Sequence, residues 1–246
     1  FDATAQATGL MRGALARAVG HVRVRRIAGE RLIDQPLMAR VLADAALDVA
    51  ATTALTIRLA HALDRAEADE AQAAYARVVI PAARYFAAKS ATLVVAEALE
   101  CLGANGFVED HDLARLHRDT PLVGLTGGAG NTLALDVLRV VEETPEVFSA
   151  AIGEIAGDLD RRTSAASTDL LRAAAEACVH DQGSARILLE QVALAAATGA
   201  LHRCAPRQLT EAFTDTRLAG PWRASHGMLD GRFDARAIVD YTVPEG

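Results

Sequence analysis

The sequence predicts an all-α protein, a four-helix up-down bundle followed by a smaller helical extension. Of its 246 residues 51% are hydrophobic, but only 4% are aromatic and alanine is abundant, which favours closely packed helices over a sheet. Apolar residues also recur at spacings of three and four over long stretches. We expect residues 1–142 to form the bundle and residues 143–246 to form the extension.

Three long helices open the predicted bundle. The first covers about residues 2–27, with the apolar side chains from Leu10 to Val22 on one face, and Ala28-Gly29 stops it. The second runs from about residue 35 to 63 with Leu37 directed inward, and the third spans about residues 71–102. A short polar segment, DRAEADE, joins the last two, so they pack as an antiparallel pair, and the fourth helix follows Asn131.

The extension begins after the segment EETPEV, which ends the last bundle helix. Further helices are predicted over about residues 148–179, 182–201 and 206–217. Residues 220–246 are rich in glycine and turn formers, so we expect them to wrap over the surface and to fray at the end.

Charge, cysteine content and hydropathy exclude several classes of protein. Residues 1–140 carry 15 basic and 16 acidic side chains, whereas residues 141–246 carry 10 basic and 16 acidic side chains. The net charge of −7 therefore lies mostly in the extension, and the chain as a whole lacks the excess of basic residues that is typical of nucleic-acid binding. The three cysteines are scattered, which indicates reduced thiols in the cytoplasm rather than disulfides or a zinc site. No uninterrupted apolar run predicts a membrane span, and the start at Phe1 within a helical pattern indicates part of a longer chain.

The segment TGGAGNTLALDVLRV places three glycines directly before an amphipathic helix. It is not a Walker A loop because no Gly-Lys-Ser/Thr follows, and Leu133 stands where a dinucleotide-binding fingerprint needs its third glycine. Two interpretations stay open. The turn could present unpaired helix amides to a phosphate, or Asn131 or Thr132 could be an ordinary N-cap with glycines that serve turn geometry.

The wider segment EALECLGANGFVEDHDLARLHRDTPLVGLTGGAGN resembles the C-terminal domain of the acyl-CoA dehydrogenase family. Its order is a helix ending in Leu-Gly-Ala-Asn-Gly-Phe, an acidic linker, an Arg-Asp pair and the glycine turn. Upstream, RRIAGERLIDQPLMARVLADAAL resembles the family's Arg-x-x-Phe-Gly segment, its glutamine and the helix that follows. The combination of IDQPLMARVLAD, GNTLALDVLRV and the extension is most similar to the AidB-like branch, flavoproteins of the adaptive response to alkylation.

The resemblance implies that the bundle contacts a flavin adenine dinucleotide (FAD) shared between subunits, and therefore a homo-oligomer. Arg25 would reach the diphosphate, and Gln35 would be a polar contact nearby. The other implied contacts are Glu100, Gly103 and Ala104 along the adenosine, and Ala129 and Asn131 in the glycine turn. Ala28 stands where the family has a flavin-contacting phenylalanine, and Glu100 replaces a frequent glutamine.

The family's reaction removes an α-proton from an acyl-CoA thioester with a carboxylate, and the usual glutamate is Gly127 here. Glycine cannot accept a proton, and the nearest acid at the start of the first helix, Asp2, is about a turn out of register with the family's alternative base. No metal-binding spacing and no nucleophile signature is present in the sequence. The AidB-like resemblance also suggests DNA contacts by Arg139 and Arg217, although the charge balance favours helix-terminal or salt-bridged roles for both.

Three functions therefore stay open. The chain is the C-terminal part of an AidB-like flavoprotein without the usual base, or part of an active acyl-CoA dehydrogenase whose base lies elsewhere, or a bundle that serves only assembly or DNA binding.

Overall fold

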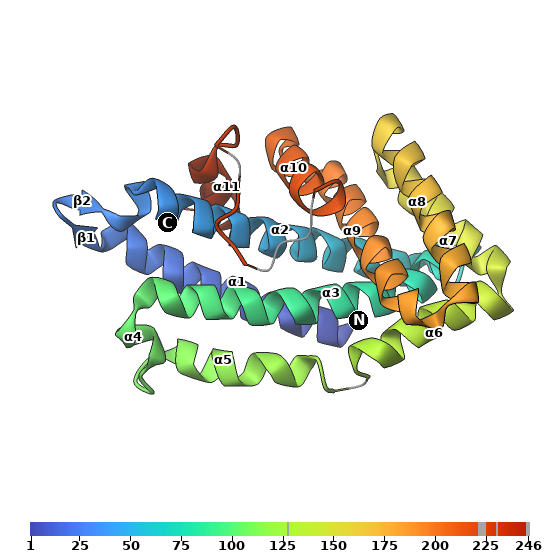
Figure 1. Ribbon diagram of the computed structural model, residues 1–246, viewed down its shortest axis with the longest axis horizontal. Helices are drawn as coiled ribbons and strands as arrows, with labels where there is room; N and C mark the ends of the chain where they lie inside the picture. Colours follow the sequence, from blue (N-terminus) through green and yellow to red (C-terminus); the bar gives the residue numbers. More distant parts are fainter. Residues whose placement is uncertain (127, 221–224, 230, 245–246) are drawn as a thin grey trace.

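The computed structural model describes residues 1–126, 128–220, 225–229 and 231–244, and it is almost entirely helical (Figure 1). A two-residue antiparallel hairpin is the single sheet in these residues. In chain order the elements are α1 (Asp2–Val24), β1 (Arg26–Ile27), β2 (Glu30–Arg31), η1 (Leu32–Asp34), α2 (Pro36–Arg65), α3 (Glu70–Leu102), α4 (Ala104–Phe107), α5 (Asp112–Val123), α6 (Gly130–Glu143), α7 (Pro145–Asp158), α8 (Arg161–His180), η2 (Gln182–Ser184), α9 (Ala185–Cys204), α10 (Arg207–Phe213), η3 (Thr214–Leu218) and α11 (Ala235–Thr242).

The first three helices form where the periodicity predicts them. Met11, Leu15 and Val22 of α1 are fully or almost fully buried, and small alanines between such residues let neighbouring helices approach closely. α2 begins with Pro36 at its first turn, where the missing amide costs nothing. α3 begins at the N-cap Asp69, whose carboxylate accepts bonds from two backbone amides of the first turn at 3.0 and 3.3 Å.

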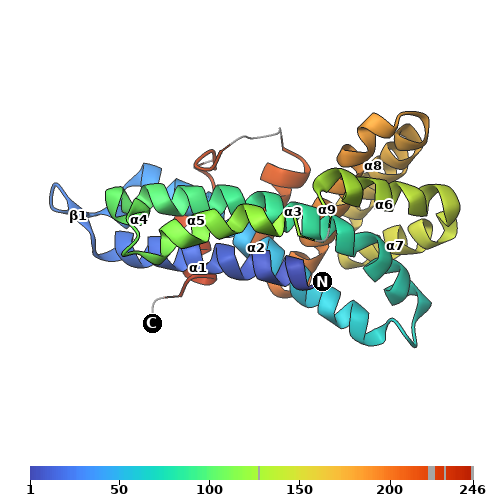
Figure 2. The ribbon, with the colours of Figure 1, turned by 90° about the horizontal axis from the view of Figure 1, so that it is seen from below.

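The fourth helix of the bundle differs from the prediction. α5, for which the sequence analysis predicted no helix, packs along α1 and α3 (Figure 2), whereas α6 after the glycine turn packs on α3, α7 and α9. The physical reason lies in the spacing of Leu113, Thr120 and Val123, which are buried on one face of α5. Pro121 lacks the amide hydrogen that would bond to the His117 carbonyl, and the helix ends two residues later, at Val123.

The extension is packed directly onto the bundle. The predicted helix over residues 148–179 is two helices, α7 and α8, because Leu159 turns to an extended conformation and Asp160 caps a new helix start. α9 packs against α2, α3, α6, α7 and α8. Residues predicted to fray contain α11, which lies on α2 and buries Ile238 and Val239.

α3 is the central helix of the molecule, in contact with α1, α2, α5, α6, α7 and α9. It is long and apolar enough to cross a membrane by length and composition, with a mean hydropathy of 1.3 over its most apolar window, but 67% of that window is buried inside the protein. A helix covered on all sides within a bundle has the same composition as a membrane span, so hydropathy alone does not separate the two.

Candidate functional site

The first candidate region is the hairpin that follows α1. α1 ends at Val24, three residues earlier than predicted, because Arg25 adopts an extended conformation (φ −66°, ψ 131°). Ala28 (φ 52°) and Gly29 (φ 88°) then make the turn with two successive left-handed residues, which suits the twist of a hairpin but strains an alanine. The Arg25 side chain is exposed and has no hydrogen-bond or ion-pair partner within the described residues.

The other residues expected to contact the nucleotide half of the cofactor lie at the same end of the bundle (Figure 1). Gln35 is the N-cap of α2 but gives the helix no side-chain cap, so the first amides of α2 keep their hydrogen-bonding capacity. Glu100 is exposed in the last turn of α3. Gly103, with φ 61°, ends that helix, and Ala104 begins α4. The structure thus brings Arg25, Gln35, Glu100, Gly103 and Ala104 to one end of the molecule.

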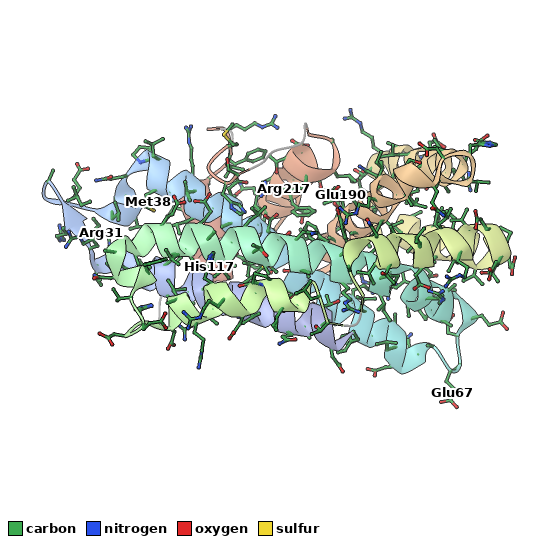
Figure 3. The ribbon with its side chains drawn as sticks, turned by 60° about the horizontal axis from the view of Figure 1, so that its bottom comes forward. Arg31, Met38, Glu67, His117, Glu190 and Arg217 are labelled. Atoms are coloured by element: carbon green, nitrogen blue, oxygen red, sulfur yellow. The ribbon has the colours of Figure 1, made fainter. Side chains whose placement is uncertain are left out.

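This end of the bundle also exposes a rim of apolar side chains. Met38 of α2, labelled in Figure 3, contacts Cys101 of α3 with the two sulfur atoms 3.6 Å apart. Leu37 is 82% exposed, so the prediction that it points inward is wrong. The apolar rim consists of Val24, Ile27, Leu37, Phe107 and Val108, all at least 47% exposed. Several large apolar side chains exposed at one end of a molecule favour an interface there.

The glycine turn lies elsewhere along the bundle. Gly127, the position of the missing glutamate, lies outside the described residues. Gly128 has φ 123°, Ala129 is the N-cap of α6 without a side-chain cap, and exposed Asn131 is the second residue of the helix. A Cβ on Gly130 would meet the Tyr85 ring at 3.0 Å, so this glycine is required by packing against α3.

The two sets of predicted contacts do not converge within one chain. α5 begins shortly after α4 at the hairpin end, and its 12 residues span about 18 Å before the glycine turn. Ala129 and Asn131 are therefore separated from Arg25 and its neighbours by the length of a helix, as Figures 1 and 2 show.

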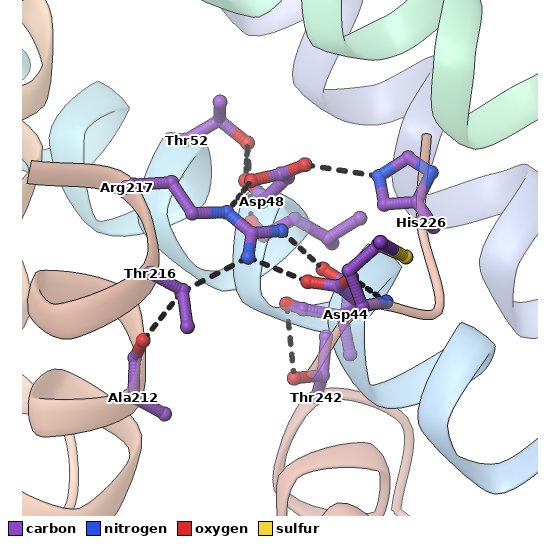
Figure 4. Close-up of polar contacts among 11 residues, drawn as sticks. Asp44, Asp48, Thr52, Ala212, Thr216, Arg217, His226 and Thr242 are labelled. Carbon is purple, nitrogen blue, oxygen red and sulfur yellow. Dashed lines mark hydrogen bonds and ion pairs between the residues drawn. The ribbon is translucent and has the colours of Figure 1, made fainter. Parts of the chain in front are cut away.

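The two arginines suggested as DNA contacts have different environments. Arg139 is 59% exposed and lies 3.7 Å from Asp136, itself paired with Arg77 at 2.9 Å. Arg217 is 13% exposed, and it donates to Asp44 at 2.5 Å and to Asp48 at 3.0 Å (Figure 4). The DNA role suggested for Arg217 does not fit this structure, because its guanidinium is enclosed between two carboxylates.

Arg217 belongs to a buried network that fastens the C-terminal segment to α2. His226 lies with Nε2 3.0 Å from Asp48 Oδ2, and the Met228 amide donates to Asp44 at 3.0 Å. Burial alone would raise the pKa of Asp48, but the charge of Arg217 and the hydrogen bond with His226 outweigh it and lower that pKa to about 2. For His226, burial lowers the pKa, but the hydrogen bond with Asp48 and its charge outweigh burial and raise it.

A second buried network joins the extension to the bundle, and the sequence analysis missed it as well. Arg58 of α2 donates to Asp158 of α7 at 2.7 Å and to Gln72 of α3 at 2.8 Å, and its guanidinium lies 4.1 Å from the centre of the Tyr75 ring. Arg203 of α9 donates to the same Asp158 carboxylate at 2.6 Å. In both networks the sequence signal is a charged residue inside an apolar helical run, such as Asp44 and Asp48 in VLADAALDVA.

Comparison with known proteins identifies the bundle. The profile of the family described as "Acyl-CoA dehydrogenase, C-terminal domain" matches residues 2–142. The chain belongs to this family. Within the acyl-CoA dehydrogenase family, Escherichia coli (strain K12) AidB is 41% identical over 160 residues, which cover 64% of this chain and 29% of AidB. The predicted family and its AidB-like character are thereby confirmed.

Solved structures show the same fold. Caenorhabditis elegans ACDH-11 in complex with C11-CoA superposes with a TM-score of 0.74 at 23% identity, over 90% of this chain and 43% of that one. A Bacillus anthracis acyl-CoA dehydrogenase complexed with FAD superposes with a TM-score of 0.70 at 12% identity, over 98% of this chain and 47% of that one. The chain thus spans less than half the length of each of these three proteins.

Proposed function

We propose that this chain is the C-terminal part of an AidB-like flavoprotein and that its hairpin end contacts the adenosine and diphosphate of FAD bound mainly by a second subunit. The observation that carries the proposal is the convergence of Arg25, Gln35 and Gly103 from three segments beside an open apolar rim. A free guanidinium and unpaired helix amides both suit a diphosphate, and a glycine without a Cβ allows close approach to the nucleotide.

The apolar rim supports assembly as part of the same proposal. A second copy of the chain, docked on Leu37 and its neighbours, would bury this rim and place the cofactor between subunits. Because the hairpin end and the glycine turn are separated by α5, Ala129 and Asn131 would contact a different FAD from the one at Arg25 in the same chain. Each cofactor would then receive contacts from two subunits.

When bound, FAD supplies a hydride acceptor. The residues of this chain would hold and orient it, and the exposed Glu100 carboxylate is an unfavourable neighbour for its phosphates. Gly127 offers no side chain to accept a substrate proton, so we propose that the usual base position is inactive. A C–H bond could be oxidised only if another carboxylate took that role.

The test uses the intact polypeptide that contains this chain, with the dissociation constant for FAD and the oligomeric state as readouts. Arg25→Ala removes a charge-assisted hydrogen bond, which weakens FAD binding by about 10- to 100-fold. The matched control is Arg172→Ala on the exposed face of α8, which leaves affinity unchanged. Leu37→Asp shifts the assembly toward monomers by placing a charge in the apolar rim.

Three results would contradict the proposal or its parts. Unchanged FAD affinity in Arg25→Ala would contradict the proposed contact between Arg25 and the diphosphate. A purified protein that neither contains nor takes up FAD would favour a bundle that serves only assembly. Bleaching of the flavin band by an acyl-CoA would instead identify an active dehydrogenase with its base outside position 127.

A further inference from the structure

A separate groove of about 540 Å³ runs along α2, away from both the hairpin end and the glycine turn. Its floor is a stripe of α2 residues spaced by three and four, Ala50, Thr53, Ala54 and Ile57. Ile57 is 67% exposed, so a large apolar side chain faces the open groove. The volume lies within the range of small-molecule sites, which is about 300–1,000 Å³.

The walls of the groove come from the extension. Ala200 and Leu201 of α9 form one side, and Tyr241 of α11 forms the other. The Tyr241 hydroxyl donates to the backbone carbonyl of Cys204 at 3.4 Å, which joins α11 to α9 beside the groove. The groove is therefore built from three helices of different parts of the chain.

Among the residues described, the lining groups with charged or basic side chains are three arginines and one histidine. Arg12, Arg58, His61 and Arg203 line the groove, and no carboxylate occurs among the described lining residues. Arg58 and Arg203 both pair with Asp158, and Glu154 lies 3.4 Å from Arg58, so both arginines already have carboxylate partners. Arg12 is exposed and has no partner in the described part of the chain. A local positive charge beside an apolar stripe contrasts with the net charge of −7.

The position of Arg12 follows from the pairing of α1 with α2. Thr8 of α1 lies 3.2 Å from Thr56 of α2, oxygen to oxygen, and the two helices run antiparallel. One turn further along α1, Arg12 therefore lies beside the Val49–Thr53 turn of α2, which is one end of the stripe. Ile57 lies further along the same face.

From this arrangement we propose that the groove binds an amphipathic carboxylate, such as the anion of a medium-chain fatty acid. The carboxylate pairs with Arg12, and the alkyl chain lies along the α2 stripe over Ile57. A guanidinium is well suited to a carboxylate, and the apolar stripe removes methylene groups from water. This site is independent of the flavin proposal because none of its lining residues belongs to the hairpin end or to the glycine turn.

The test is calorimetric titration of the intact polypeptide that contains this chain with octanoate, decanoate and dodecanoate, and with dodecanol as an uncharged probe. Each added methylene is expected to tighten binding by about two- to fourfold, and dodecanol is expected to bind more weakly than dodecanoate. Arg12→Gln should weaken dodecanoate by about fivefold and leave dodecanol unchanged. Ile57→Trp fills the groove and should abolish binding.

Two variants on α8 control for nonspecific effects. Leu170→Trp adds the same ring at an exposed apolar position, and Arg172→Gln removes an exposed charge. Both should bind dodecanoate as the unmodified chain does. Affinity that does not depend on chain length, or that is equal in Arg12→Gln and Arg172→Gln, would overturn the proposal. The proposal would also be overturned if the protein formed a dimer that Ile57→Trp dissociates but that dodecanoate leaves intact. In that case a second copy of the chain would occupy the groove.

Discussion

Replacement of the buried Asp158 carboxylate by an amide should strongly destabilise the fold. Its carboxylate is 6% exposed and accepts bonds from Arg58 and Arg203 at 2.7 and 2.6 Å. Asp158→Asn keeps the shape of the side chain but removes its negative charge and one of its two accepting oxygens. The Arg58 guanidinium, also 6% exposed, then stays buried without its main counter-charge. Removing one partner of a buried pair costs about 3–5 kcal/mol. We expect the lower end, because Glu154 remains 3.4 Å from Arg58.

The assay is urea unfolding followed by far-UV circular dichroism, with the free energy of unfolding as the readout. Glu109→Gln is the matched control, since Glu109 pairs with Arg118 on the surface and this change should leave stability within error. Replacing both buried partners, as Arg58→Met with Asp158→Leu, should recover part of the loss, because the charges left without these partners, Arg203 and Glu154, have side chains that are 55% and 31% exposed. A loss in Asp158→Asn no larger than that of the control would refute the reasoning.

Three further predictions concern single positions. Gly199→Ala should lower the free energy of unfolding by about 1–3 kcal/mol, because the new Cβ would lie 2.8 Å from Asp158 Cβ. Gly153→Ala, where a Cβ meets nothing within 4 Å, should raise it by up to about 1 kcal/mol. Equal effects of the two changes in chemical denaturation would contradict this prediction. The pKa of His226 is raised in the folded chain, so its contribution to stability is complete below the unfolded value of 6.5 and is lost as pH rises through the folded pKa. The free energy of unfolding should therefore fall as pH rises above 6.5 in the unmodified chain, and fall less in His226→Gln. Ala28→Gly should stabilise the fold by about 1 kcal/mol, because glycine adopts the left-handed conformation of residue 28 without the strain of a Cβ. The thermal midpoint should therefore rise, and an unchanged midpoint would show that the turn is unstrained.

The long helices were predictable because their cores repeat with helical spacing, and the errors have local causes. α5 was not predicted as a helix, and its signal is weak because the segment is only 12 residues long and contains Pro121. The break between α7 and α8 had a visible signal, Asp160, whose carboxylate accepts from two amides of α8. The hairpin could not be foreseen, since alanine rarely adopts the conformation that Ala28 has here.

The candidate site was predictable only where a motif carried it. Arg25, Gln35 and Gly103 were selected by resemblance, and the fold brings them together at the hairpin end. The buried networks depend on contacts between distant segments, for example Arg217 with Asp48, which are 169 residues apart. A pattern of local spacing shows that Asp44 and Asp48 share a helix face, but it contains nothing about which cation will reach them.

The central place of α3 has a consequence for synthesis of the chain on the ribosome. Its apolar surface is covered partly by α1 and α2, which are made before it, and partly by α7 and α9, which are made after it. Until Cys204 has left the exit tunnel, a helix apolar enough to resemble a membrane span is without its final cover. The nascent protein therefore carries its greatest risk of aggregation between the completion of α3 and the arrival of α9.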